Sequence, residues 1–185
     1  PTDPQRATVV DLHWLHRVAR AMGLVEFEDL QLCAPWKLQL LCRALLAHCA
    51  MLRGCEHRDG LRVGDIVTIT PTFMQLRVAD RYSQKKMKLM PGRMCVVPVE
   101  RSLRSAGGVL WVYLARMHPA RRPDDILFPQ ISRDGRLLRK AQTDRQFVSA
   151  FTRQVRAAGM PAAELRHVPD GTERERGRER GTKNQ

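Results

Sequence analysis

Apolar residues recur at the spacing of an amphipathic helix in the first third of the chain. Residues 8–22 place their apolar side chains on one face, with Thr8 positioned to cap the helix and Gly23 to stop it. A second helical pattern begins at Pro35, a residue tolerated in a first turn, and continues to about Gly54. These patterns predict two helices, joined by a connector with a short helical turn.

Helical spacing returns in the second half of the chain. Residues 102–117 predict a third long helix, although Gly107 and Gly108 are expected to weaken its early part. Thr143 is placed to cap a fourth helix, whose apolar face continues until Gly159 stops it.

Between the second and third helices the pattern changes to that of strands. Residues 63–70, 73–78 and 94–99 are short apolar runs with β-branched side chains, bounded by turn residues. Their connections are too short for crossover helices, so the pairing should be antiparallel. We therefore predict an α+β fold, mostly α, with helices around a small three-stranded antiparallel sheet. A further turn is predicted at Asp134–Gly135.

The composition divides the chain into three parts. Residues 1–7 are polar and are expected to be loose, and residues 8–168 carry the patterns of a folded domain. From residue 169 onward the sequence is rich in Arg and Glu and has no hydrophobic face, so we expect a disordered tail.

The net charge narrows the range of partners. The 185 residues carry a net charge of +13, and only 5% of them are aromatic. A surplus of this size favours a polyanionic partner such as nucleic acid. The low aromatic content argues against a base-stacking platform. The alternative is a solvated, arginine-rich surface without a polyanionic partner.

The cysteines and the apolar runs exclude other classes. The five cysteines form no CxxC pair and have no zinc-ligand spacing, so we predict no metal and no cofactor. Cys42 and Cys49, seven residues apart in a helix, are expected to be small buried apolar residues. No apolar run approaches 18 residues, so no membrane span is predicted. The compartment stays open, with the nucleus expected if the chain is eukaryotic.

Four short motifs follow one another along residues 9–167. They are Met51-Leu52-Arg53-Gly54-Cys55-Glu56, the basic run Lys85-Lys86-Met87-Lys88, Leu127-Phe128-Pro129, and Leu165-Arg166-His167. None is specific alone, but the ordered set, with strands between the first two, resembles the catalytic domain of tyrosine recombinases (phage integrases). It looks closest to the versions carried by retroelements.

The resemblance implies a chemistry for the two arginines. In this family a tyrosine attacks a DNA phosphate, and two arginines bind the non-bridging oxygens, because guanidinium groups match phosphate geometry. By this resemblance Arg53 and Arg166 are the phosphate-binding pair, and Glu56 orients Arg53. Arg53 can also be read as a cation that favours the end of a helix, and Arg166 as a chance match in an arginine-rich chain.

The resemblance also implies proton-transfer residues. A hairpin lysine protonates the leaving oxygen, for which Lys88 is the first choice and Lys86 the second, and His167 assists at the phosphate. The lysine run is equally consistent with a solvated hairpin edge or with phosphate contacts that play no part in catalysis.

The chain departs from the family pattern in two ways. Ala163 stands where the family has a histidine, and Tyr82 and Tyr113 both precede the last motif, so no tyrosine nucleophile follows it. The Arg/Glu-rich end favours a truncated or frameshifted C-terminus. We therefore expect a domain that binds the phosphate backbone of double-stranded DNA, is compatible with homo-oligomers on DNA, and is catalytically incomplete. The alternatives are an active recombinase whose C-terminal end was lost, and a non-catalytic α-rich interaction protein with incidental basic charge.

Overall fold

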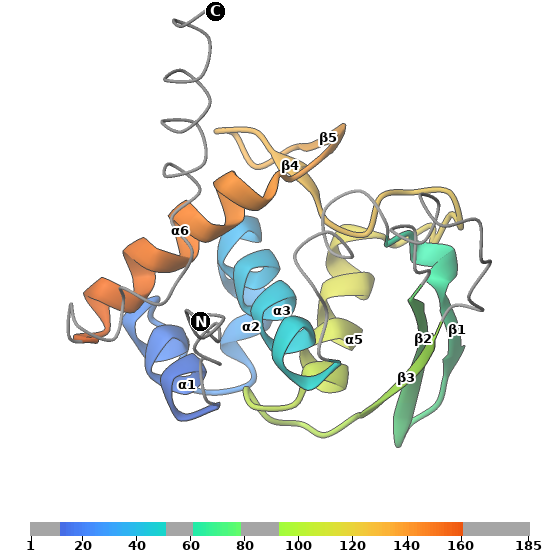
Figure 1. The fold of residues 1–185 in the computed structure, drawn as a ribbon, viewed down its shortest axis with the longest axis horizontal. Coiled ribbons are helices and arrows are strands. Elements are labelled where there is room, and N and C mark those ends of the chain that lie inside the picture. Colours follow the sequence, from blue (N-terminus) through green and yellow to red (C-terminus); the bar gives the residue numbers. More distant parts are fainter. Residues whose placement is uncertain (1–11, 51–60, 79–92, 161–185) are drawn as a thin grey trace, which may run out of the picture.

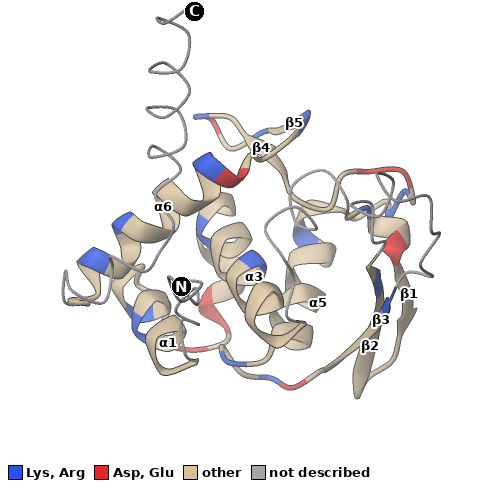
Figure 2. Cartoon of the chain, viewed as in Figure 1, with Lys and Arg blue, Asp and Glu red and all other residues tan. Residues whose placement is uncertain are grey.

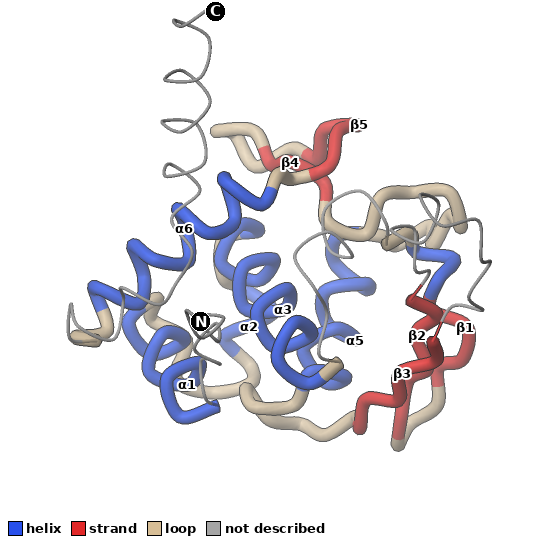
Figure 3. Tube along the Cα trace, in the orientation of Figure 1, coloured by secondary structure: helices blue, strands red, loops and turns tan. Residues whose placement is uncertain are grey.

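The described part of the chain forms an α+β fold (Figure 1). The structure is a computed structural model, which describes residues 12–50, 61–78 and 93–160. Within these ranges there are five α-helices, a three-stranded antiparallel sheet and a two-stranded sheet. Figure 3 shows the helices gathered on one side and the three-stranded sheet on the other. The predicted class, α+β with a small three-stranded antiparallel sheet, is confirmed.

The elements have these bounds. The helices are α1 (Leu12–Ala21), α2 (Asp29–Leu32), α3 (Pro35–Cys49), α5 (Ala106–Met117) and α6 (Asp144–Ala157). The strands are β1 (Ile66–Ile69), β2 (Phe73–Val78), β3 (Arg93–Pro98), β4 (Pro129–Ile131) and β5 (Leu137–Ala141).

Helix α3 lies at the centre of the helical side. It packs against α1, α5 and α6, and every residue from Leu38 to Leu46 is buried. A helix that is buried on all sides needs apolar residues around its whole circumference, which its leucine-rich sequence supplies. Cys42 is buried as predicted, but the prediction was wrong for Cys49, which lies exposed in the last turn.

The predicted helix boundaries are largely confirmed. Pro35 lies in the first turn of α3, and Thr143 caps α6. Gly23 and Gly159 have positive φ angles of 78° and 83° just after α1 and α6, a conformation that favours glycine. The predicted cap at Thr8 lies outside the described residues.

The start of α5 corrects the prediction of a helix from residue 102. Ser105 accepts a hydrogen bond from Gly108 N and donates one to Pro98 O, so the helix begins only after it. A Cβ atom on Gly107 or Gly108 would overlap the carbonyl oxygens of Pro98 and Glu100, respectively. The two glycines thus let α5 approach β3 closely, a role that the expectation of a weakened helix did not include.

The three-stranded sheet has the order β1-β2-β3, with one face toward the core. Met74 of β2 pairs with Val97 of β3, and both are fully buried. The opposite face leaves apolar side chains exposed, namely Val67, Met94 and Val96. The first strand is shorter than predicted, because residues 63–65 form a 3-10 turn whose Gly64 lies against Pro123.

The two-stranded sheet was not predicted. Strands β4 and β5 form a hairpin in which Ile131 pairs with Leu137. Its turn contains Gly135 at φ 84°, which confirms the predicted turn at Asp134–Gly135. Leu127 and Phe128, directly before β4, are buried and fix the hairpin to the core.

Candidate nucleic-acid interface

The residues predicted from the resemblance cannot be placed relative to one another. All six lie outside the described part of the chain: Arg53, Glu56, Lys86, Lys88, Arg166 and His167. Their convergence on one surface therefore stays a prediction.

The described ends of two of these segments lie close together. Ala50, directly after α3, precedes the segment that carries Arg53, and its carbonyl oxygen is 3.7 Å from Cys95 Sγ of β3. Val78 and Arg93 are paired at the end of β2 and β3, from which the lysine-bearing connection leaves. The chain thus enters both segments beside the same strand pair.

The segment that carries Arg166 begins away from the β2–β3 strand pair. It follows the end of α6, where Arg17 of α1 donates a hydrogen bond to Ala158 O over 2.9 Å. In Figure 1 this end of α6 lies on the far side of α1 from the three-stranded sheet.

A buried arginine in α3 connects that helix to the start of α6. Arg43 has no exposed side-chain surface and donates to Gln142 Oε1 over 3.0 Å and to Asp144 Oδ1 over 2.8 Å. Its guanidinium also lies 4.4 Å from the centre of the Phe147 ring. Burial lowers the pKa of Arg43 to about 10, and the nearby Asp144 carboxylate opposes that shift. Arg43 therefore stays charged at neutral pH.

Gln39 makes the corresponding connection to the other strand of the hairpin. It lies one turn before Arg43, so both side chains project from the same side of α3. Gln39 Nε2 donates to Pro129 O over 2.8 Å, and its Oε1 accepts from Tyr113 OH over 3.0 Å. Helix α3 thus fixes the first residue of β4 and the residues that follow β5.

Tyr113 is an internal structural residue. Its side chain is fully buried, and its hydroxyl lies 2.7 Å from Leu127 O as well as near Gln39. Burial raises the pKa of Tyr113 well above its usual value. A buried phenol with these partners cannot act as a nucleophile toward DNA, which agrees with the structural role expected for it.

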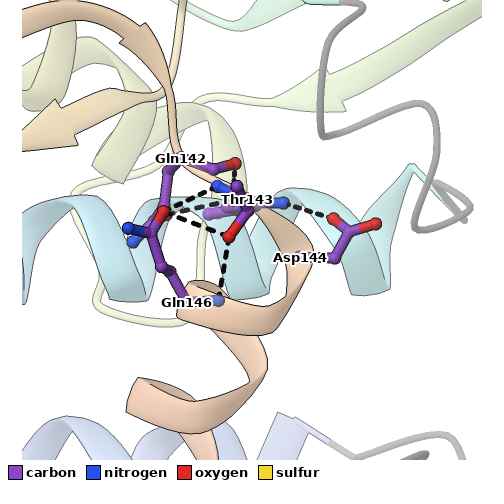
Figure 4. Close-up of polar contacts among 5 residues, drawn as sticks. Gln142, Thr143, Asp144 and Gln146 are labelled. Carbon is purple, nitrogen blue, oxygen red and sulfur yellow. Dashed lines mark hydrogen bonds and ion pairs between the residues drawn. The ribbon is translucent and has the colours of Figure 1, made fainter. Parts of the chain in front are cut away.

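The start of α6 is fixed by a capping box. Thr143 Oγ1 accepts from Gln146 N over 3.2 Å, and Gln146 Oε1 accepts from Thr143 N over 2.9 Å. Figure 4 shows these two residues together with Gln142 and Asp144, the partners of Arg43. The turn between β5 and α6 is therefore held by the capping box at the start of α6 and by Arg43 of α3.

Residues 133–156, on this hairpin and helix, carry much of the positive charge. Seven cations against two carboxylates give this stretch a net charge of +5, out of +13 for the whole chain. The seven are exposed, and Figure 2 shows Lys and Arg along α6 and on the hairpin. We call this set the basic face: Arg133, Arg136, Arg139, Lys140, Arg145, Arg153 and Arg156.

The two carboxylates of this stretch do little to neutralise the basic face. Asp144 is held by the buried Arg43, and Asp134 forms an exposed ion pair with Arg136 at 2.9 Å, which solvent screens. On α6, Arg153 lies on the side opposite the buried Val155, and Arg156 is also exposed. Cations carried by a ribbon and an adjoining helix side can contact successive phosphates of a polyanion.

The sequence analysis predicted neither the basic face nor the role of Arg43, which connects α3 to the start of α6. The cations are spread over a hairpin that the strand pattern did not reveal, so no local run marked them. Arg43 had a visible signal, since it is the single charged residue in the apolar run from Leu40 to Leu46. A lone cation in a buried helix needs a buried partner.

Two further classes of feature are absent from the described residues. No group of three or more His, Cys, Asp or Glu side chains there could hold a metal ion. None of the described helices combines the length and the apolar character needed to cross a membrane. No protein-family model, curated protein or solved structure matches the chain.

Proposed function

We propose that this chain is a double-stranded DNA-binding domain, organised like the catalytic domain of tyrosine recombinases but catalytically incomplete. The ordered motifs from Arg53 to Arg166 and the order of helices and antiparallel strands support the relationship to recombination and integration. The absence of a tyrosine after Arg166 supports the lack of strand cleavage by this chain alone.

The basic face is the observation that carries the DNA-binding part of the proposal. Its cations lie on elements that α3 holds in position through Arg43 and Gln39. Contacts with phosphates release condensed counterions, so binding should weaken steeply as the salt concentration rises. Such contacts position a protein on DNA without reading sequence.

DNA binding can be tested with a labelled duplex of random sequence, by fluorescence anisotropy at about 50 mM and 200 mM salt. Arg139→Glu in the basic face should weaken binding and reduce the slope of log K against log salt. The matched control is Arg104→Glu, an exposed arginine in the loop before α5, which should leave both nearly unchanged. No affinity at low salt, or equal losses in both variants, would contradict the proposal.

The catalytic part needs a separate assay. A duplex with a nick that traps covalent intermediates should yield no protein–DNA adduct, because Tyr113 is buried and Tyr82 precedes the family motif that the nucleophile should follow. A phosphotyrosyl adduct would show that the chain cleaves DNA after all.

The alternative is a non-catalytic α-rich interaction protein whose basic charge is incidental. The anisotropy experiment separates the two, since this alternative predicts a folded chain without affinity for the duplex at low salt.

A further inference from the structure

An apolar groove lies on the side of the molecule away from the β4–β5 hairpin. It has a volume of about 520 Å³ and runs between α2, α5 and the ends of the three-stranded sheet. Its apolar lining includes Phe27, Pro71, Val99 and Trp111. Trp111 is 38% exposed, although most of α5 is buried. A large aromatic side chain left uncovered in a groove is typical of a docking site.

The rim of this groove is locally acidic in a strongly basic chain. Glu28 and Glu100 line it, and Glu26 and Asp29 lie beside Glu28 in the sequence. Arg101 also lines the groove and forms an ion pair with Glu28, so these two charges offset each other and the acidic character of the lining rests on Glu100. An apolar floor with carboxylates at its edge complements a segment that carries an apolar side chain between cations.

The chain itself presents such a segment on the basic face. Leu138 of β5 is 43% exposed, on a strand that continues with Arg139 and Lys140. It alternates with the partly buried Leu137, so it lies on the outer side of the hairpin. Gln39 and Arg43 hold the residues at the two ends of the hairpin, so its base loses little conformational freedom when it docks.

We propose that the β4–β5 hairpin of one copy docks into the groove of a second copy. Leu138 occupies the apolar groove beside Trp111, and Lys140 lies against the rim that includes Glu100. Figure 1 places the hairpin at the top of the molecule and the loop that carries Glu100 at the bottom, so the two surfaces belong to different copies. The contact is therefore head-to-tail and leaves a free hairpin and a free groove at the ends of each assembly. This inference does not rest on the proposed DNA binding, although both use the same hairpin.

A hairpin tip in a groove buries a small area, so the association is weak and sensitive to salt. Sedimentation equilibrium without DNA, at low salt and up to about 1 mM protein, should show an average mass that rises with concentration. Leu138→Asp should prevent the hairpin from entering the apolar groove, and Glu100→Arg should repel the cations of the hairpin at the rim. Each substitution should reduce the average mass toward that of the monomer. Circular dichroism and thermal melting establish that both variants are folded.

Mixing the two variants gives the decisive outcome. Leu138→Asp keeps an intact groove and Glu100→Arg keeps an intact hairpin, so an equal mixture should form dimers that grow no further. The control is Val96→Asp, on the exposed face of the three-stranded sheet, which should associate like the parent chain. A monomeric parent chain, single variants that still associate, a mixture without dimers, or loss of association in Val96→Asp would each overturn the proposal.

Discussion

The two sides of the molecule are joined to its central helices by different means. At the β4–β5 hairpin and α6, two buried polar side chains of α3 make the connection: Gln39 donates to the backbone carbonyl of Pro129, and Arg43 donates to Asp144. At the three-stranded sheet, the first turn of α5 lies against the end of β3, with Gly107 and Gly108 at the contact. The first junction depends on a buried charge and its hydrogen bonds, whereas the second also requires the absence of side-chain volume at two positions.

This difference decides which substitutions each junction tolerates. Removing one partner of a buried ion pair leaves the other charge buried and uncompensated, so it lowers stability more than removing a charge at the surface does. A close backbone contact leaves no room for even one methyl group. The hairpin side should therefore respond to the loss of a polar partner, and the sheet side should respond both to such a loss and to an added methyl group.

The largest expected effect is at the sheet junction. Gly108→Ala places a Cβ atom on the carbonyl oxygen of Glu100, which belongs to the backbone and cannot rotate away. We expect the free energy of unfolding to fall by about 3 kcal/mol or more, as in severe overpacking. Urea denaturation followed by circular dichroism measures this loss.

Ala115→Gly, at an exposed position of the same helix, is the control for changes in helix propensity. It should cost about 1 kcal/mol. If Gly108→Ala were as stable as the parent chain, α5 could not lie as close to residues 98–100 as the structure shows.

The next effect tests the hairpin junction. Asp144→Ala leaves the guanidinium of Arg43 buried without its carboxylate, and we expect a loss of about 2–3 kcal/mol. Asp134→Ala removes the partner of an exposed arginine, Arg136, and should cost less than about 0.5 kcal/mol. Both can be measured by urea denaturation. Equal losses in the two variants would show that the burial of Arg43 has no energetic consequence.

The helix caps give a smaller contrast between the same two junctions. Ser105 caps α5, is buried, and also accepts from Glu100 N and donates to Pro98 O. Ser105→Ala should cost about 2 kcal/mol, because it removes a cap and leaves buried polar groups unpaired. Thr143→Ala removes the exposed cap of α6 and should cost about 1 kcal/mol. Thermal unfolding of both variants should preserve this order, and the reverse order would show that the burial and the additional hydrogen bonds of Ser105 add nothing to its role as a cap.

The sequence was informative where a single local pattern determines an element. The start of α3 at Pro35, the cap at Thr143 and the stops at Gly23 and Gly159 follow from the local chemistry of helix ends, and they lie where they were predicted. The strand 73–78 was likewise predicted from its alternation with correct bounds.

It was less informative where an element depends on distant partners. The hairpin β4–β5 is short, and the residues at its two ends are held by Gln39 and Arg43 of α3, far away in the sequence. Gly107 and Gly108 looked like weak helix formers because their contact with the end of β3 cannot be read from local propensity. The candidate site was predicted from a resemblance, and its residues lie outside the described ranges, so that prediction still awaits a test.

The smallest expected effect concerns His118, which follows α5 and bonds toward the start of the hairpin. Its Nε2 lies 3.0 Å from Leu127 O, and burial lowers its pKa below the ordinary value of about 6.5. As the pH falls below about 6.5, the unfolded chain binds a proton that the folded chain resists, so stability is lost in this range.

His118→Gln removes this group, and the fall in unfolding free energy between pH 7.5 and pH 5.5 should become shallower. His16, whose pKa is also lowered by burial, should account for part of the remaining slope. Urea denaturation at both pH values measures the difference, and an unchanged slope in His118→Gln would show that this histidine is as free to charge in the folded protein as in the unfolded chain.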